Sequence, residues 1–88
     1  MSLDEKDVVA RVERVTLREL RLWVREGWVR PATGEAGPVF DEVDIARVHL
    51  LCELRKDMAL PNDALPTVLT LLDHLHRRAL IARRQLPL

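Results

Sequence analysis

Three arginines share one face of a short expected helix. Arg18, Arg21 and Arg25 stand three and four residues apart, so a 3.6-residue repeat brings them onto one narrow arc. Guanidinium groups bind phosphates and carboxylates through paired hydrogen bonds. The pattern predicts a surface for an anionic partner, either a nucleic acid or an acidic protein. A solvated helix face, with Glu19 and Glu26 as ion-pair partners, is the alternative explanation of the same spacing.

The helix that presents these arginines carries its own start and stop signals. Thr16 and Glu19 form a T-x-x-E capping box, in which each side chain accepts a hydrogen bond from an otherwise unpaired N–H group. We therefore expect the helix to begin at Leu17. Gly27 follows the last turn as a left-handed C-cap residue, which lets the chain reverse direction. Three apolar residues are expected on the arc opposite the arginines: Leu17, Leu20 and Val24.

The flanking segments predict a helix-turn-helix. A short helix is expected at residues 7–12, and a tight turn at residues 13–15 joins it to the arginine-bearing helix. Residues 31–38 form a loop by composition. Asp41 caps a third helix that ends near Ala59, with acidic residues in its first turn, where the helix dipole favours them. The apolar stripe of this third helix is Ile45, Val48, Leu51, Cys52 and Met58.

A fourth helix with an apolar seam completes the chain. Asp63 is its expected N-cap, which places Pro66 in the first turn, where a missing N–H group breaks no helical bond. Apolar and small residues then recur three and four apart to the end of the chain, as in a coiled-coil seam. We expect this seam to form a homodimer interface. Its candidate residues are Val68, Leu72, Leu75, Ala79, Ala82 and Leu86.

The charge distribution and the apolar content of the chain indicate which classes of protein it can belong to. The chain has 88 residues and no net charge, yet residues 11–30 carry an excess of three positive charges and residues 31–60 an excess of three negative ones. A dedicated nucleic-acid module usually has a basic excess overall, because phosphate neutralisation supplies most of its affinity. The sequence shows no leader and no apolar run of roughly 20 residues, so we expect a cytoplasmic protein.

The sequence offers little for catalysis or metal binding. Cys52 is the only cysteine and falls on an apolar helix face, which favours a buried, unreactive thiol. His74 and His76 stand two residues apart, so their rings would point about 200° apart on a helix. We therefore expect no enzyme activity, no metal and no cofactor.

Residues 16–31, TLRELRLWVREGWVRP, followed by a loop and by FDEVDIARV, resemble the DNA-binding head of MerR-type regulators. The resemblance implies an all-α, MerR-like winged helix-turn-helix head at residues 1–60, and a long C-terminal dimerisation helix at residues 61–88, within one compact domain. The positions that contact DNA in that family are here Thr16, Arg18 and Arg21. Leu22 and Trp23 replace the family's phosphate-binding tyrosine pair, and the wing lacks the usual Gly-Tyr-Arg.

The second half of the chain resembles a narrower group, the chaperone-modulator family CbpM. Three segments carry this resemblance in order: Val39-Phe40-Asp41, Leu54-Arg55-Lys56-Asp57-Met58 and Leu71-Leu72-Asp73-His74-Leu75. The resemblance implies a protein that binds the J-domain of a DnaJ/CbpA-type co-chaperone and inhibits it, in competition with the DnaK-type partner. A J-domain presents a basic helix, so carboxylates are the candidate contacts. These are Asp41, Glu42, Asp44 and Asp57.

Other interpretations of the chain remain open. Helix capping alone would account for the first three of these carboxylates. A MerR-like DNA-binding transcriptional regulator is the main alternative to the co-chaperone modulator. A structural dimerisation module without a regulatory partner is the third.

Overall fold

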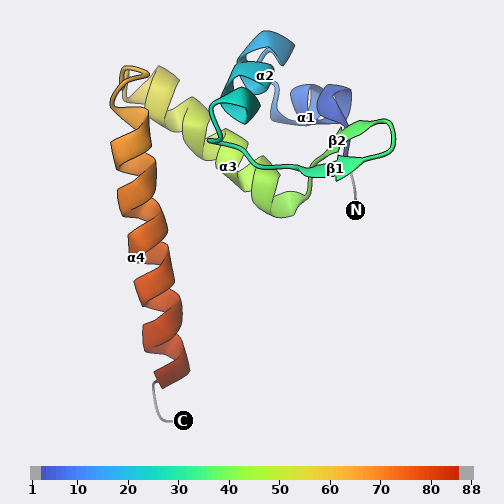
Figure 1. Ribbon diagram of the computed structural model, residues 1–88. Coiled ribbons are helices and arrows are strands. Elements are labelled where there is room, and N and C mark those ends of the chain that lie inside the picture. Colours follow the sequence, from blue (N-terminus) through green and yellow to red (C-terminus); the bar gives the residue numbers. More distant parts are fainter. Residues whose placement is uncertain (1–2, 86–88) are drawn as a thin grey trace.

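The computed structural model describes residues 3–85, and side chains as far as residue 78. A helix-turn-helix is followed by a small hairpin, a third helix and a fourth helix that extends away from the rest (Figure 1). The elements are α1 (Glu5–Val12), α2 (Leu17–Arg25), β1 (Ala32–Gly34), β2 (Gly37–Val39), α3 (Glu42–Cys52), η1 (Glu53–Asp57) and α4 (Leu65–Gln85). We call α1 to η1 the head. No described helix is both long and apolar enough to cross a membrane.

Each of the first three helices begins with a reciprocal capping box. The predicted box of α2 is confirmed: the Glu19 N–H donates to Thr16 Oγ1 at 3.1 Å, and the Thr16 N–H donates to Glu19 Oε1 at 3.0 Å. Asp41 caps α3 as predicted. The first helix starts earlier than the expected residue 7, because Asp4 caps it at Glu5.

The end of α2 confirms the role predicted for Gly27. Its φ of 78° lies in the left-handed region, which glycine adopts without a Cβ penalty. The Gly27 N–H donates to the Val24 carbonyl at 3.1 Å, and the Trp28 N–H donates to the Trp23 carbonyl at 2.9 Å. These two bonds form a Schellman motif, which satisfies carbonyls that a helix end otherwise leaves unpaired.

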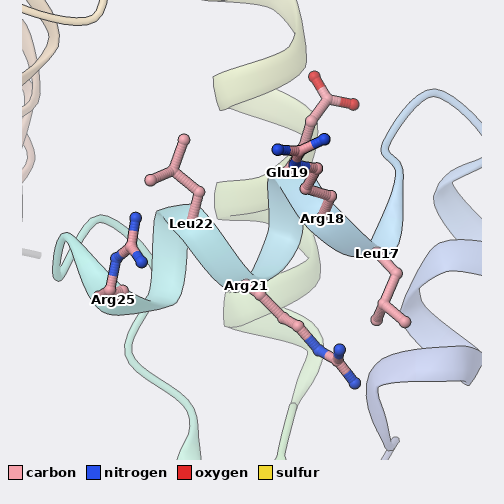
Figure 2. Close-up of a pocket in the computed structure, with 6 residues that line it drawn as sticks. All are labelled: Leu17, Arg18, Glu19, Arg21, Leu22 and Arg25. Atoms are coloured by element: carbon pink, nitrogen blue, oxygen red, sulfur yellow. The ribbon is translucent and has the colours of Figure 1, made fainter.

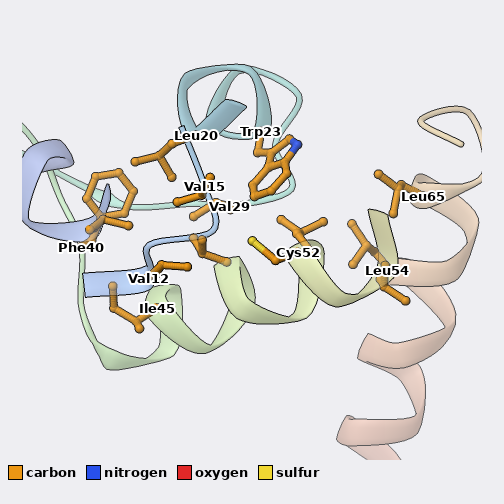
Figure 3. Packing of buried hydrophobic residues seen from close by; sticks show 14 residues of the cluster. Val12, Val15, Leu20, Trp23, Val29, Phe40, Ile45, Cys52, Leu54 and Leu65 are labelled. Carbon is orange, nitrogen blue, oxygen red and sulfur yellow. The ribbon is translucent and has the colours of Figure 1, made fainter. Parts of the chain in front are cut away.

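The hydrophobic core lies where α1, α2 and the hairpin meet α3 (Figure 3). Trp23 and Phe40 are its largest buried side chains. Trp28 is only half-buried and packs at the edge of this core. Cys52 is buried as predicted, and burial raises the pKa of its thiol, which disfavours the reactive thiolate.

A two-stranded wing replaces the loop predicted at residues 31–38. Strands β1 and β2 are antiparallel, with Ala32 opposite Val39 and Gly34 opposite Gly37. Leu3 extends the pairing through an isolated bridge to Phe40. The fold is therefore mostly helical with a small wing rather than strictly all-α. Composition marked the turn residues but could not assign the short ladder that they connect.

The third helix ends differently from the prediction. α3 stops at Cys52 and continues as the π-helical turn η1, instead of running unbroken to Ala59. The wider turn rotates the following side chains, so Met58 is 65% exposed and does not belong to the predicted apolar stripe. Ala59 then adopts a left-handed φ of 54° and turns the chain toward α4.

The fourth helix is anchored only at its beginning. It starts at Leu65, so Asp63 lies in the preceding turn and is not the N-cap that we predicted. Leu65 and Leu69 are buried in the head core, whereas Leu71 and Leu75 are about three-fifths exposed, at 59% and 62%. Of the predicted seam, Val68 and Leu72 are half-buried against the core. The Ala79 and Ala82 side chains and Leu86 lie outside the described residues.

Candidate interaction site

The outer side of α2 is a shallow hollow of mixed character. It is lined by Leu17, Arg18, Glu19, Arg21, Leu22 and Arg25 (Figure 2). Leu20 and Trp23 are the residues of α2 that enter the core. Leu17 is half-buried and lies on the arginine side, so its predicted place on the opposite arc was wrong: residues four apart are only about 40° apart on a helix, which puts Leu17 beside Arg21.

Arg21 is held away from the other two arginines. Its Nε donates to Glu5 Oε2 at 2.9 Å, and a second guanidinium nitrogen donates to Glu5 Oε1 at 3.3 Å. The side chain leaves α2 in the direction of α1 (Figure 2). This hydrogen-bonded pairing raises the pKa of Arg21. A phosphate would have to compete with the Glu5 carboxylate for this guanidinium group.

The ion pairs expected within α2 are not the ones that form. Glu19 accepts a hydrogen bond from Lys56 Nζ at 3.2 Å, and Lys56 also donates to the Arg14 carbonyl. Partial burial of Glu19 favours its neutral form, but the hydrogen bonds from Thr16 and Lys56 outweigh this and lower its pKa. Lys56 thereby ties η1 to the turn that precedes α2.

Arg18 and Arg25 remain open to solvent. Both side chains are exposed, and within the described part of the chain no carboxylate lies at ion-pair distance from either. Leu22 projects from the same face between them in sequence (Figure 2). Thr16, the third DNA-contact candidate, is exposed, and its hydroxyl oxygen accepts the capping hydrogen bond. Thr16, Arg18 and Arg21 therefore lie at or just after the start of α2, and Arg21 is the member of this trio whose donors are already engaged.

The wing does not add positive charge to this site. Residues 32–39 contain neither lysine nor arginine, and Glu35 occupies the exposed tip between β1 and β2. A carboxylate there repels phosphate. The wing that would flank DNA in a winged helix-turn-helix is thus acidic at its end.

The four carboxylates predicted to bind a J-domain divide into two places. Asp41, Glu42 and Asp44 cluster at the start of α3, whereas Asp57 lies at the end of η1, roughly 20 Å away at about 1.5 Å per helical residue. Asp41 and Asp44 form the capping box of α3. The hydrogen bond from the Asp44 N–H lowers the pKa of Asp41, while partial burial and the nearby Asp41 carboxylate raise the pKa of Asp44.

The other two carboxylates have arginine partners inside the head. Glu42 receives two hydrogen bonds from Arg11, at 2.9 and 3.2 Å. Asp57 receives two from Arg14, at 2.7 and 3.1 Å, and these bonds lower the pKa of Asp57. Both pairs are exposed, so each contributes little to stability and can exchange its partner at modest cost.

An apolar side chain stands inside the acidic cluster at the start of α3. Val43 follows Asp41 and Glu42, precedes Asp44, and is 76% exposed. It also borders two shallow hollows between α3 and α4, which Arg47 and Asp73 line with it. Arg47 donates to Asp73 at 2.9 and 3.2 Å and to the Trp28 carbonyl at 3.0 Å, so it joins α3 to α4 and to the segment after α2. Among the described residues, no group of three potential metal ligands is close enough to hold an ion.

Residues 7–72 match the family described as MerR HTH family regulatory protein. The match covers the helix-turn-helix, the wing, α3 and the anchored start of α4. The chain belongs to the MerR family. No curated protein matches it, and no solved structure does.

Two features of this MerR head escaped sequence reasoning. The Arg21–Glu5 pair joins residues 16 apart, which no helical spacing rule connects. Arg25 was counted in the arginine arc but not among the contact candidates, although the structure leaves it more available than Arg21. The acidic first turn of α1 was the available signal for the first feature, because a helix packed on α2 brings such a carboxylate within reach of the arginines.

Proposed function

We propose that this MerR-family chain is a small regulatory binding protein that binds the J-domain of a DnaJ/CbpA-type co-chaperone and inhibits it. The observation that carries the proposal is Val43, a 76% exposed apolar side chain set among Asp41, Glu42 and Asp44. An apolar contact with carboxylates around it is complementary to a basic amphipathic helix, the surface that a J-domain presents to its chaperone. The CbpM resemblance, which extends from Val39 to Leu75, supports the same partner.

The recognition helix supports a protein partner over DNA. Arg21 is already paired, Leu22 presents methyl groups where phosphates would sit, and the wing tip is acidic. Few phosphates per protomer could therefore be neutralised, and neutralisation supplies most of the affinity of a DNA-binding module.

Isothermal titration against the J-domain of the cognate co-chaperone tests the proposal. We expect a dissociation constant of about one micromolar or tighter, which corresponds to a binding free energy of roughly 8 kcal/mol. Val43→Ser should weaken binding, whereas Met58→Ser, at a similarly exposed apolar site directly after η1, should not. Absence of heat and of a complex in gel filtration would refute the J-domain proposal.

Association kinetics then assign the acidic contact. Glu42→Lys should slow association with the J-domain if the start of α3 faces the basic helix, because charge reversal changes the rate of encounter. Asp57→Lys makes the same charge reversal at the far end of η1, and is the matched control for Glu42→Lys. A slower association for Asp57→Lys alone would move the contact to η1 and contradict the assignment to Val43.

Sequence-specific DNA binding is a second candidate function, favoured by the MerR family match and by the exposed Arg18 and Arg25. We expect at most weak binding that falls steeply with salt. Fluorescence anisotropy with duplex DNA tests this expectation. Nanomolar, sequence-specific binding at physiological salt that is lost on Arg18→Ala would make the regulator the better interpretation.

We also propose a homodimer built on α4. The supporting observation is that Leu75 continues the seam of Val68 and Leu72 beyond the point where the head covers it. Apolar burial contributes about 25 cal/mol per Å² and favours covering this surface with a second copy. If neither a J-domain nor DNA binds, a stable dimer alone would support the structural dimerisation module.

A further inference from the structure

The exposed face of α2 combines two open guanidinium groups with two apolar side chains. We define the α2 face as Leu17, Arg18, Leu22 and Arg25, which line one shallow hollow (Figure 2). Arg18 and Arg25 are seven residues apart, so about two helical turns, or roughly 10 Å, separate them along the axis. Leu22 lies between them, within about 60° of each around the helix. An apolar side chain thus lies between the two unpaired guanidinium groups.

This arrangement suits carboxylates better than phosphates. A nucleic-acid backbone needs hydrogen-bond donors or cations at successive phosphates, and Leu22 supplies neither. Arg21, the arginine nearest to Leu17, is already paired with Glu5. A protein partner can instead place an apolar side chain on Leu22 and one carboxylate on each open arginine. Each such carboxylate can accept two parallel hydrogen bonds from a guanidinium group.

We infer that the α2 face binds an acidic amphipathic helix of a protein partner. A helix matches it if its carboxylates are seven residues apart with an apolar residue between them, as in Glu-x-x-Leu-x-x-x-Glu, because a partner helix that runs antiparallel to α2 then meets Arg25, Leu22 and Arg18 in that order. The inference goes beyond J-domain binding. A basic J-domain helix would be repelled by this face, so the two partners require different surfaces.

Fluorescence anisotropy with the full chain and a labelled helical peptide tests the inference. The probe is an Ala-rich peptide of about 20 residues that carries Glu-x-x-Leu-x-x-x-Glu, long enough to form a helix. A second peptide with lysine in both glutamate positions is the control probe, and a random-sequence DNA duplex is the competitor. We expect salt-dependent binding of the acidic peptide, and at least about fivefold weaker binding of the lysine peptide.

Variants of the chain locate the binding. Arg25→Glu and Leu22→Asn should each weaken binding of the acidic peptide at least about fivefold, because the exposed Arg25 and the half-buried Leu22 both line the hollow and supply the central contacts. Arg78→Glu makes the same charge change at an exposed site on α4 and should leave binding unchanged. The double variant Arg18→Glu with Arg25→Glu should prefer the lysine peptide. Such an exchange of preference is not produced by partial unfolding.

Three results would overturn the inference. They are no binding of the acidic peptide, equal binding of both peptides, and displacement of the acidic peptide by the duplex at physiological salt. The last result would assign the α2 face to nucleic acid. None of them depends on whether a J-domain binds the chain, so the failure of one proposal is distinguishable from the failure of the other.

Discussion

The head and α4 bury their apolar residues to very different extents. In the head, three capped helices and the wing enclose Trp23, Phe40 and their neighbours almost completely. In α4, Leu65 and Leu69 complete that core, but Leu71 and Leu75 are more than half exposed. The core of the head is thus closed with the help of two α4 residues, whereas α4 then extends away from the head with Leu71 and Leu75 exposed (Figure 1).

The two regions also differ in how their charges are used. Within the head, ion pairs connect distant segments: Arg11 with Glu42, Arg14 with Asp57 and Arg21 with Glu5. One pair, Arg47–Asp73, fastens α4 to α3. Each is exposed and contributes little alone, so the difference in packing decides which region unfolds first. We expect α4 to open locally while the head stays folded.

The largest expected effect is on the core of the head. Phe40→Ala removes a fully buried ring and leaves a cavity, so we expect the free energy of unfolding to fall by about 3–5 kcal/mol. Leu71→Ala, at an exposed position of α4, should change it by less than about 0.5 kcal/mol. Urea unfolding followed by circular dichroism measures both. Equal losses for the two variants would contradict the division into a closed head and an open helix.

The next effect concerns the exposed surface of α4. In the proposed dimer, Leu75→Glu buries a carboxylate without a partner in each protomer, so we expect the dimer dissociation constant to rise at least about a hundredfold, or roughly 2.7 kcal/mol. Ala79→Glu should act in the same way from further along the seam. Arg77→Glu, outside the seam, should have much less effect. Light scattering with size exclusion decides, and a monomeric wild type or a fully dimeric Leu75→Glu variant would refute the seam.

Local signals in the sequence were sufficient for most of the head. The Thr16 and Asp41 caps and the Gly27 stop were predicted because each depends on residues a few positions apart. The core of α3 from Ile45 to Cys52 followed from helical periodicity.

Features that depend on tertiary contacts or on a break in helical geometry were not predictable in this way. The π-helical turn η1 rotates Met58 out of the stripe that a regular helix would give it. The Arg21–Glu5 pair exists only because α1 packs beside α2. Similarly, the wing strands are three residues each, too short to show an alternating pattern.

Substitutions at the start of a helix should have a smaller effect on stability, and this effect should differ between α2 and α4. Thr16→Ala removes the oxygen that accepts the Glu19 N–H, so we expect α2 and the head to lose about 1 kcal/mol of stability. Asp63→Ala should cost less, because Asp63 lies outside the N-cap position of α4. Thermal and urea unfolding measure the two variants. A larger loss for Asp63→Ala would show that the start of α4 has its own side-chain cap.

The smallest expected effect is on the pH dependence of stability, to which one ion-paired aspartate contributes in the head and another in α4. The hydrogen bonds from Arg14 and from Arg47 lower the pKa of Asp57 and of Asp73, respectively. In an unfolded chain, the pKa of an aspartate side chain is about 3.9. A lowered folded pKa therefore stabilises the protein above that pH, and the stabilisation is lost as the pH falls through the folded pKa.

Neutral variants of these aspartates separate the two locations. Asp57→Asn should lower the stability of the head near pH 6, and its difference from wild type should shrink as the pH falls below about 3.9, the unfolded pKa, toward the lowered folded pKa. Asp73→Asn should show the same pH dependence, but in the hydrogen exchange of α4 amides rather than in global unfolding, because its partner Arg47 joins α4 to α3. Glu35→Gln removes one charge at the wing tip and serves as the control. A difference from wild type that stays constant as the pH falls from about 6 to well below the unfolded pKa would show that the ion pairs are not its source.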